Sequence, residues 1–333
     1  MINWTAQEIV LDLKYTWKIS RNATDQKKNL IVRISDGTFE GSGEAAPNIR
    51  YQETPEQLLL QVELFINAIR GRELSFEVLK EVFNQHGIAY ALRFGIESAW
   101  VHFEAKRKRI SVPGFLNIPS AESIQTSYTV PIMETSLIRN FYAENKLSRF
   151  PFVKLKINAD EGYEMTKYLA SFCNQKIMID ANEAFSDPDH CIYFLEKIKK
   201  LPVELIEQPM PAGKDEEGKY LKKYCPFPLF ADEAITHNAD FGLLTEQFDG
   251  VNVKLMKAGG YQNGIRLLSE AKKYGMRTMI GCMVETTIGI SSGMNLCALA
   301  DYADLDSFLL IKEEPFHLIR EENGTLLFNS NVS

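Results

Sequence analysis

The chain has 333 residues, of which 45% are hydrophobic and 24% are charged, and its formal net charge is −7. This length suits one large barrel with an accessory domain, or two to three smaller domains. The negative charge and the shortness of the basic clusters argue against a general nucleic-acid binder. The sequence has no run of about 18 apolar residues, which argues against a membrane-spanning helix.

The five cysteines are an odd number and form no Cys-x-x-Cys pair. They are typical of reduced thiols in a cytosolic protein rather than of a disulfide framework. The first residues open directly into a strand-like pattern, without the basic and apolar segments of a secretion signal. We therefore expect a cytoplasmic protein that binds neither nucleic acid nor membrane.

Residues 1–112 mix strand and helix patterns and are expected to form an α+β domain. Asp36-Gly37 lies between two apolar runs and is a hairpin signal, while Thr54-Pro55 supplies the N-cap and first residue of a helix. The expected elements are strands at 6–13 and 29–35 and helices at 54–71 and 88–108. Val112-Pro-Gly114 interrupts the helical pattern and marks the domain boundary.

A repeat of short apolar runs follows this boundary, and segments long enough for an amphipathic helix separate most of the runs. The eight runs lie at 127–130, 152–157, 177–180, 203–207, 229–232, 251–254, 278–281 and 303–308. The alternation predicts a parallel βα barrel at 113–308, with the active site at the carboxyl ends of the strands. The tail, residues 309–333, is expected to return to the first domain as a hairpin around Asn323-Gly324.

Charged residues lie at or near the carboxyl ends of five successive runs, in the order Lys156, Asp180, Glu207, Asp232 and Lys254. One such residue alone is usually a solvated or salt-bridged strand end, but five in register at the catalytic face of a barrel favour a functional site. Three converging carboxylates repel one another unless a cation lies among them. Oxygen ligands without Cys or His favour Mg²⁺ first and Mn²⁺ second.

Lys154 and Lys156 share one face of their strand, because residues two apart point the same way. The second and sixth strands of an eight-stranded ring face each other, so we expect Lys156 and Lys254 on opposite sides of the site. One amine could take the α-proton of a carboxylate substrate while the other returns it to the opposite face. A nearby cation is expected to lower the pKa of such a lysine toward neutrality, and Lys154 suits polarisation of the substrate carboxylate.

Together these motifs resemble the muconate-lactonizing subgroup of the enolase superfamily. The resemblance rests on Lys154-x-Lys156, Asp180-Ala-Asn182, Ile206-Glu-Gln-Pro209, Ala231-Asp-Glu233 and Asn252-Val-Lys254 with Gly259-Gly260. It implies an α/β fold, a (β/α)7β modified TIM barrel with an α+β N-terminal capping domain completed by the C-terminal tail. It further implies that Asp180, Glu207 and Asp232 bind Mg²⁺, that Lys156 and Lys254 are the acid/base catalysts, and that Asn182 and Glu233 support the ligands.

The eighth run favours one reaction within this subgroup. Asp304 and Asp306 on one strand face could bind a cationic group, and they are similar to the Asp-x-Asp with which dipeptide epimerases hold the substrate α-ammonium. Met283 and Glu285 are also similar to that family and are expected to contact the substrate. We predict a dipeptide epimerase that inverts the α-carbon of the carboxy-terminal residue through an enediolate. An N-acylamino-acid racemase, a cycloisomerase and an o-succinylbenzoate synthase are the alternatives within the subgroup.

Arg21 lies in a loop that closes over the barrel in this family. Relatives place an arginine there that contacts an acidic side chain, which implies a substrate such as L-Ala-D/L-Glu from murein peptides. The second capping loop, residues 48–51, departs from the family patterns. A catalytically silent barrel that acts as a binding protein is the alternative of another class, and family members are often homo-oligomers.

Overall fold

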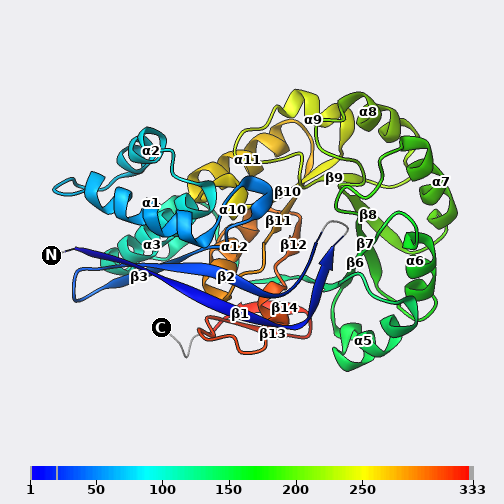
Figure 1. Cartoon of the computed structure of the whole chain (residues 1–333), viewed down its shortest axis with the longest axis horizontal. Helices are drawn as coiled ribbons and strands as arrows, with labels where there is room; N and C mark the ends of the chain where they lie inside the picture. Colours follow the sequence, from blue (N-terminus) through cyan, green and yellow to red (C-terminus); the bar gives the residue numbers. More distant parts are fainter. Residues whose placement is uncertain (1, 20–21, 330–333) are drawn as a thin grey trace.

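The computed structural model describes residues 2–19 and 22–329, and Figure 1 shows a capping domain beside a barrel. Arg21, the expected contact for an acidic substrate side chain, lies outside the described residues. None of the helices in the described part is long and apolar enough to cross a membrane. All five cysteines are free thiols, as the sequence predicted.

The capping domain is built on an antiparallel sheet with strand order β1-β2-β3. Its elements are β1 (Asn3–Ile19), β2 (Asn22–Ser35), β3 (Glu40–Ala45), α1 (Pro55–Ala68), α2 (Phe76–Gln85) and α3 (Tyr90–Lys108). Strand β3 lies so close to α3 that a Cβ at Gly41 or Gly43 would be 2.1 Å from a backbone oxygen of the helix. Thr54 caps α1 as predicted, whereas α2 was not predicted.

The barrel sheet contains eight strands, and every adjacent pair in its ladder is parallel. The strands, in chain order, are β5 (Ser127–Val130), β6 (Phe152–Lys156), β7 (Lys176–Asp180), β8 (Val203–Glu207), β9 (Leu229–Ala231), β10 (Gly250–Lys254), β11 (Arg277–Gly281) and β12 (Tyr302–Asp304). Each of the eight predicted runs overlaps one of these strands. The predicted βα barrel is confirmed.

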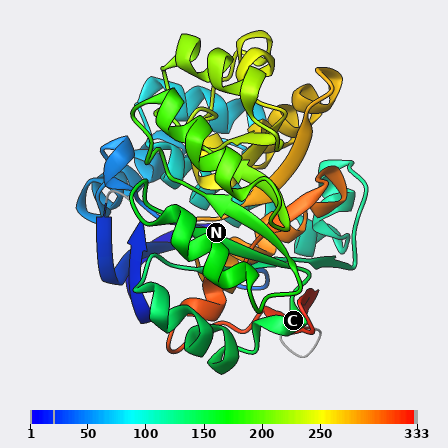
Figure 2. The ribbon, with the colours of Figure 1, turned by 90° about the vertical axis from the view of Figure 1, so that its right-hand side faces the viewer.

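Helices follow the strands and cover the outside of the barrel. They are α5 (Ile138–Glu144), α6 (Gly162–Ala170), α7 (Pro188–Ile198), α8 (Asp215–Tyr224), α9 (Phe241–Gln247), α10 (Leu255–Ala258), α11 (Tyr261–Lys273) and α12 (Thr287–Met294). Figure 2 shows the outer face, on which the green helices lie in front of the strands. Seven strand–helix units and a final strand give the (β/α)7β order. The predicted boundary at 112 falls at the start of a short helix, α4 (Val112–Leu116).

The barrel closes between its last and first strands through side chains rather than a backbone ladder. Thr126 Oγ1 accepts a hydrogen bond from Leu305 N at 2.9 Å, and Ser127 Oγ donates to Asp304 Oδ1 at 2.7 Å. Thr129 N donates to Asp306 Oδ2 at 2.5 Å. The two aspartates of the Asp-x-Asp motif therefore hold the seam of the barrel.

The carboxy-terminal tail differs from its prediction in one respect. Its hairpin, β13 (Ile319–Glu322) and β14 (Thr325–Phe328), pairs with β4 (Ser123–Gln125), which precedes the barrel, and not with the capping sheet. Leu326 of β14 is buried and pairs with Ile124 of β4. The earlier part of the tail does reach the capping domain, where Ile311 forms a β-bridge to Leu13 of β1.

Two buried glutamates of the capping domain dock it onto helix starts of the barrel. Glu44 of β3 accepts hydrogen bonds from Thr286 N and Gly289 N at the start of α12, each at 3.0 Å. Glu97 of α3 accepts one from Gln262 N at the start of α11, at 2.9 Å. Free N–H groups and the helix dipole make a helix N-terminus a favourable place for a carboxylate. These contacts fix the cap over the strand ends.

Candidate active site

A cavity of about 540 Å³ lies between the carboxyl ends of the barrel strands and the capping domain. Its barrel side includes Lys154, Lys156, Asp232, Lys254, Asp304 and Asp306. Its cap side includes Trp17, Thr24, Lys27, Asn48, Ile49 and Arg50. The cavity therefore occupies the position at which this barrel architecture places active sites.

Strand β6 directs two lysines into the barrel, as the alternation of its sequence predicts. Lys154 and Lys156 are both buried, while Val153 and Leu155 belong to the hydrophobic core on the other face of the strand. Buried lysines require carboxylate partners, because an unpaired buried ammonium is costly. The strand ends supply these partners.

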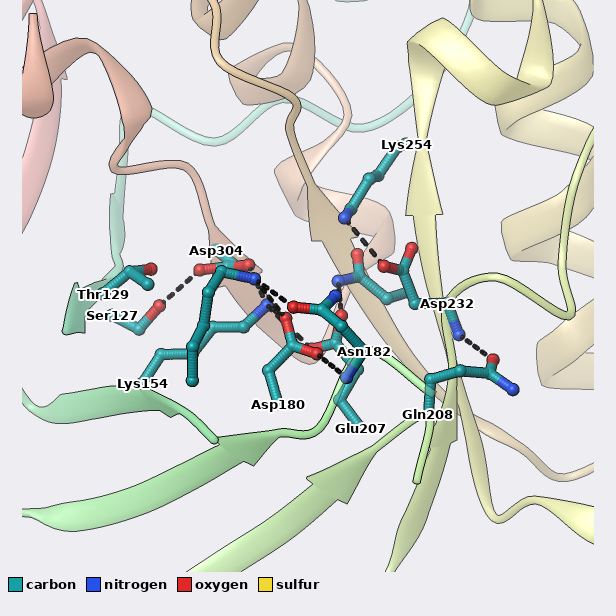
Figure 3. A network of polar contacts seen from close by, with 12 residues as sticks. Ser127, Thr129, Lys154, Asp180, Asn182, Glu207, Gln208, Asp232, Lys254 and Asp304 are labelled. Carbon is teal, nitrogen blue, oxygen red and sulfur yellow. Dashed lines mark hydrogen bonds and ion pairs between the residues drawn. The ribbon is translucent and has the colours of Figure 1, made fainter. Parts of the chain in front are cut away.

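The ammonium group of Lys154 lies among three carboxylates (Figure 3). Its Nζ is 2.6 Å from Asp304 Oδ2, 2.9 Å from Glu207 Oε2 and 3.2 Å from Asp180 Oδ2. The register of β7 and β8 sets Asp180 directly beside Glu207. Asn252 Nδ2 donates to Glu207 Oε1 at 2.9 Å and fixes its orientation.

Lys156 lies two residues after Lys154 on β6 and contacts the same cluster of carboxylates. Its Nζ donates to Asp180 Oδ2 at 2.7 Å and to Asn182 Oδ1 at 2.9 Å. The ring of Trp17, from β1 of the cap, lies over this ammonium with its centroid 5.3 Å away. A desolvated cation–π contact of this kind stabilises the ammonium, so the cap and the barrel together fix the position of Lys156.

Lys254 ends β10 on the side of the ring opposite Lys156, four strands along the sheet. Its Nζ is 2.9 Å from Asp232 Oδ2. Asp232 also binds a second buried lysine, since Lys257 Nζ lies 2.6 Å from Oδ1 and donates to the Asp232 carbonyl. Lys257 was not among the residues predicted from the sequence, although it lies three residues, about one helical turn, after Lys254.

Gln208, which directly follows β8, was also not predicted as a site residue. Its Oε1 accepts hydrogen bonds from Asp232 N and Ala234 N, both at 2.9 Å, and its Nε2 donates to Met210 O at 2.9 Å. Figure 3 shows this amide turned toward the Asp232 backbone. The Gln that follows Glu207 in the motif therefore positions the next strand end.

The electrostatic balance keeps most of these groups charged. Burial lowers the pKa of Lys154 and of Lys254, but the surrounding carboxylates outweigh burial and hold both pKa values above the ordinary range. Burial raises the pKa of Asp180, but Lys154 and Lys156 outweigh it and keep that pKa below its ordinary value. Asp232 contributes most to the raised pKa of Lys254, and the lowering of a lysine pKa by a bound divalent cation stays a prediction.

Glu207 is the exception among the predicted metal ligands. Burial raises its pKa to about 7, since Lys154 only partly offsets the desolvation. Its Oε2 is a buried atom that has the ion pair to Lys154 but no hydrogen-bond partner. A buried carboxylate oxygen in this state is suited to a cation that approaches from the cavity.

The described residues form no group of three His, Cys, Asp or Glu side chains close enough to hold a metal ion. Lysine ammonium groups lie between the carboxylates instead. The donor chemistry nevertheless fits a hard divalent ion, because Asp180, Glu207 and Asp232 contribute only oxygen atoms from adjacent strand ends. An ion held by Asp180 and Glu207 would take over the charge compensation that the Lys154 ammonium supplies between them.

Asp304 and Asp306 both line the cavity, but the expected strand geometry is wrong. Strand β12 ends at Asp304, and Asp306 precedes a 3-10 turn, Ser307–Leu310. Asp306 turns inward because the amide of Thr129 binds its Oδ2. Burial and then the charge of Asp304 raise the pKa of Asp306 to about 7. The pair can accept a cation that compensates both carboxylates.

The remaining predicted residues fall into two groups. Met283, Asn182 and Glu233 line the cavity. Glu285 does not belong to the lining residues: its Oε1 accepts from Met283 N at 2.7 Å, beneath its own loop. Burial and then the nearby Glu44 raise its pKa to about 8. Glu285 therefore shapes the loop that carries Met283. It was predicted to contact the substrate itself.

The second capping loop closes one side of the cavity through a two-pronged ion pair. Arg50 Nη1 and Nη2 are 2.6 and 2.7 Å from the carboxylate oxygens of Glu183, which follows β7. Tyr51 from the same loop lines the cavity. Burial and then the nearby Asp232 raise the pKa of its phenol. This loop showed no family pattern in the sequence, yet it joins the cap to the barrel.

A protein-family model described as Enolase C-terminal domain-like matches residues 139–321, more than half of the chain. The chain belongs to this family. An L-Ala-D/L-amino acid epimerase from Flavobacterium johnsoniae is 33% identical over 329 residues, with 97% of this chain and 96% of the relative covered. A hydrophobic dipeptide epimerase from Roseobacter litoralis is 27% identical over 327 residues, with coverages of 96% and 94%.

A solved structure gives the same assignment. An enolase family member from Agrobacterium tumefaciens with homology to dipeptide epimerases, solved with bound sodium and L-Ala-L-Glu, has a TM-score of 0.89 and 28% identity. The match covers 99% of this chain and 98% of that one. The resemblance to the enolase superfamily and the predicted fold are confirmed. The relatives also confirm an isomerase of the racemase and epimerase class.

Proposed function

We propose that the protein is a metal-dependent dipeptide epimerase that inverts the α-carbon of the carboxy-terminal residue by a two-base proton transfer. The observation that carries this proposal is the placement of Lys156 and Lys254 on opposite sides of one cavity, four strands apart. A substrate α-carbon between them can lose its proton to one amine and receive a proton from the other. This arrangement inverts the centre without moving the substrate.

Asp180, Glu207 and Asp232 would hold the metal ion, with Mg²⁺ as the first choice and Mn²⁺ as the second. When bound, the ion stabilises the negative charge that develops on the substrate carboxylate as the α-proton leaves. Lys154, displaced from between Asp180 and Glu207, would donate hydrogen bonds to the same carboxylate. Its ammonium group stays charged, since nearby carboxylates raise its pKa.

Asp304 and Asp306 would bind the α-ammonium of the dipeptide. The two buried carboxylates leave a negative region beside Lys154 that suits a zwitterionic dipeptide. Substrates without an ammonium group, such as N-acylated amino acids or muconate, would leave this region unpaired. The free amino terminus is therefore the feature that separates a dipeptide epimerase from the racemase and cycloisomerase alternatives. Dipeptides of the L-Ala-D/L-Glu type are the first substrates to test.

Deuterium incorporation from D₂O tests the two-base mechanism with a panel of L-Ala dipeptides. Lys156→Met and Lys254→Met should each reduce epimerisation by at least about 10²-fold, the usual contribution of a general acid or base. Each variant should still exchange the α-proton of the one stereoisomer that faces the remaining lysine. Epimerisation at the wild-type rate in either variant would contradict the assignment.

The structure indicates that both variants should fold. Asp180 keeps its contact with Lys154 when Lys156 is replaced, and Asp232 keeps Lys257 when Lys254 is replaced. Lys223→Met, at an exposed position of α8, serves as the matched control and should retain full activity. Circular dichroism of all three variants verifies the fold. A wild-type protein that exchanges no α-proton of any dipeptide, with or without Mg²⁺, would favour the silent binding barrel instead.

A further inference from the structure

Five lysine and arginine side chains among the described residues line the cavity, and four of them have carboxylate partners. Lys154, Lys156 and Lys254 contact the strand-end acids, and Arg50 contacts Glu183. Lys27 of β2 is the fifth. Its ammonium has no hydrogen bond or ion pair within the part of the chain that the structure describes. A partly buried cation beside a substrate cavity and without a counter-ion is unexpected unless a ligand supplies the charge.

The geometry of the β1–β2 ribbon directs Lys27 at the barrel. Lys27 pairs with Leu11 in the antiparallel register, and paired residues lie on the same face of the ribbon. Leu11 is buried against Val284, which follows β11 of the barrel. Two residues along β2, Asn29 donates a hydrogen bond to Val284 O at 2.9 Å. Lys27 therefore points from the cap into the cavity.

The neighbouring lysine provides an internal comparison. Lys28 lies on the opposite face of β2, pairs with the exposed Val10, and forms a solvent-exposed ion pair with Glu8 at 3.0 Å. Lys27 has no such partner, and burial lowers its pKa. The strand thus presents one lysine to solvent, where it is paired, and one to the cavity, where it is not.

We propose that Lys27 is a specificity residue that binds a carboxylate on a side chain of the dipeptide. This inference rests on the proposed function, which already uses the α-ammonium at Asp304 and Asp306 and the α-carboxylate at Lys154. A side-chain carboxylate is the anionic group of an acidic dipeptide that these contacts leave free. Binding it to a partly desolvated ammonium gives a strong, charge-assisted hydrogen bond. Acidic dipeptides, with Glu or Asp at one position, are then the preferred substrate class.

Paired acidic and amide substrates test this assignment, because Glu and Gln differ in charge and little in shape. For wild type, kcat/KM for L-Ala-L-Glu should exceed that for L-Ala-L-Gln by at least about tenfold, equivalent to about 1.4 kcal/mol. Lys27→Met should reduce this preference at least about tenfold, mainly through KM. A second pair, L-Asp-L-Ala and L-Asn-L-Ala, shows whether the first or the second residue carries the carboxylate.

Lys28→Met is the matched control and should leave both ratios as in wild type. Lys27→Glu should reverse the preference, so that L-Ala-L-Lys or L-Lys-L-Ala becomes better than the acidic dipeptide. An unchanged preference in Lys27→Met, or a wild-type protein that prefers neutral dipeptides, would overturn the role of Lys27 while leaving the epimerase proposal in place. A wild-type protein that epimerises no dipeptide would overturn both.

Discussion

The contact of Glu44 with α12 gives a prediction about how the cap is held over the active site. Glu44 is fully buried and accepts hydrogen bonds from four donors: Thr286 N, Thr286 Oγ1, Gly289 N and Asn29 Nδ2. Burial raises its pKa, and the donors from Thr286 and Asn29 oppose that rise. Replacing Glu44 with Ala leaves all four donors buried without this acceptor.

The expected loss of stability follows from these contacts. Hydrogen bonds to a charged group contribute roughly 1.5–3 kcal/mol each, but burying the carboxylate itself costs several kcal/mol. We therefore expect Glu44→Ala to lower the free energy of unfolding by about 4 kcal/mol, within the range seen when one partner of a buried charged network is removed. Glu44→Gln keeps one acceptor oxygen and should lose about half as much.

Urea unfolding followed by circular dichroism measures this loss, and hydrogen exchange reports whether it arises at the cap. The amides of Thr286 and Gly289 should exchange faster in Glu44→Ala. Glu40→Ala is the matched control, because Glu40 lies on the same strand with its side chain 57% exposed and only a 3.7 Å contact to Arg33. The control should change the free energy of unfolding by less than about 0.5 kcal/mol. A loss below about 1 kcal/mol in Glu44→Ala would refute the reasoning.

Two further predictions concern charges at the cap. Burial lowers the pKa of His102 to about 4, so the folded state binds fewer protons than the unfolded state between pH 6.5 and 4. The free energy of unfolding should fall by about 3 kcal/mol as the pH drops through that range. His102→Gln should remove this part of the pH dependence, measured as the free energy of unfolding at pH 7 and at pH 4.5. An equal pH dependence in the variant and the wild type would contradict the prediction. Arg50→Met breaks the two-pronged ion pair with Glu183 and should raise KM several-fold. The free energy of unfolding should fall by roughly 1.5–3 kcal/mol, because the Glu183 side chain is only 6% exposed. Arg72→Met, at a surface pair, is the control, and an unchanged KM would argue against a role of this ion pair in closing the cavity.

The sequence by itself determined the barrel and the line of charged strand ends. Side chains alternate between the two faces of a strand, which is a local property of the chain. This alternation predicted that Lys154 and Lys156 point into the barrel and that Val153 and Leu155 lie in the hydrophobic core on the other face. The spacing of the βα repeat placed Lys156 and Lys254 on opposite strands. The family motifs gave the expected role of each residue. Helix α2 was missed, although Leu79, Val82 and Phe83 have the i, i+3, i+4 spacing of an amphipathic helix and Ser75 supplies its N-cap.

Tertiary structure decided which groups touch. No local pattern shows that Lys154 lies between Glu207 and Asp304, since those contacts join residues far apart in the chain. The tail hairpin was expected to pack on the cap, but it pairs with β4. A turn signal in the sequence predicts the two strands of a hairpin and does not predict which further strand they pair with. Asp306 left the predicted strand because the Thr129 amide binds its carboxylate across the barrel seam.

The two lysines of β2 illustrate the same division. The sequence Lys27-Lys28 determines that the two side chains point to opposite faces of a strand, and nothing more. Only the docking of β2 over the loop after β11, through Asn29 and Val284, decides that Lys27 faces the cavity. Specificity depends on such contacts between cap and barrel, because each domain supplies one wall of the site. The sequence of one domain does not determine which residues of the other domain lie opposite it.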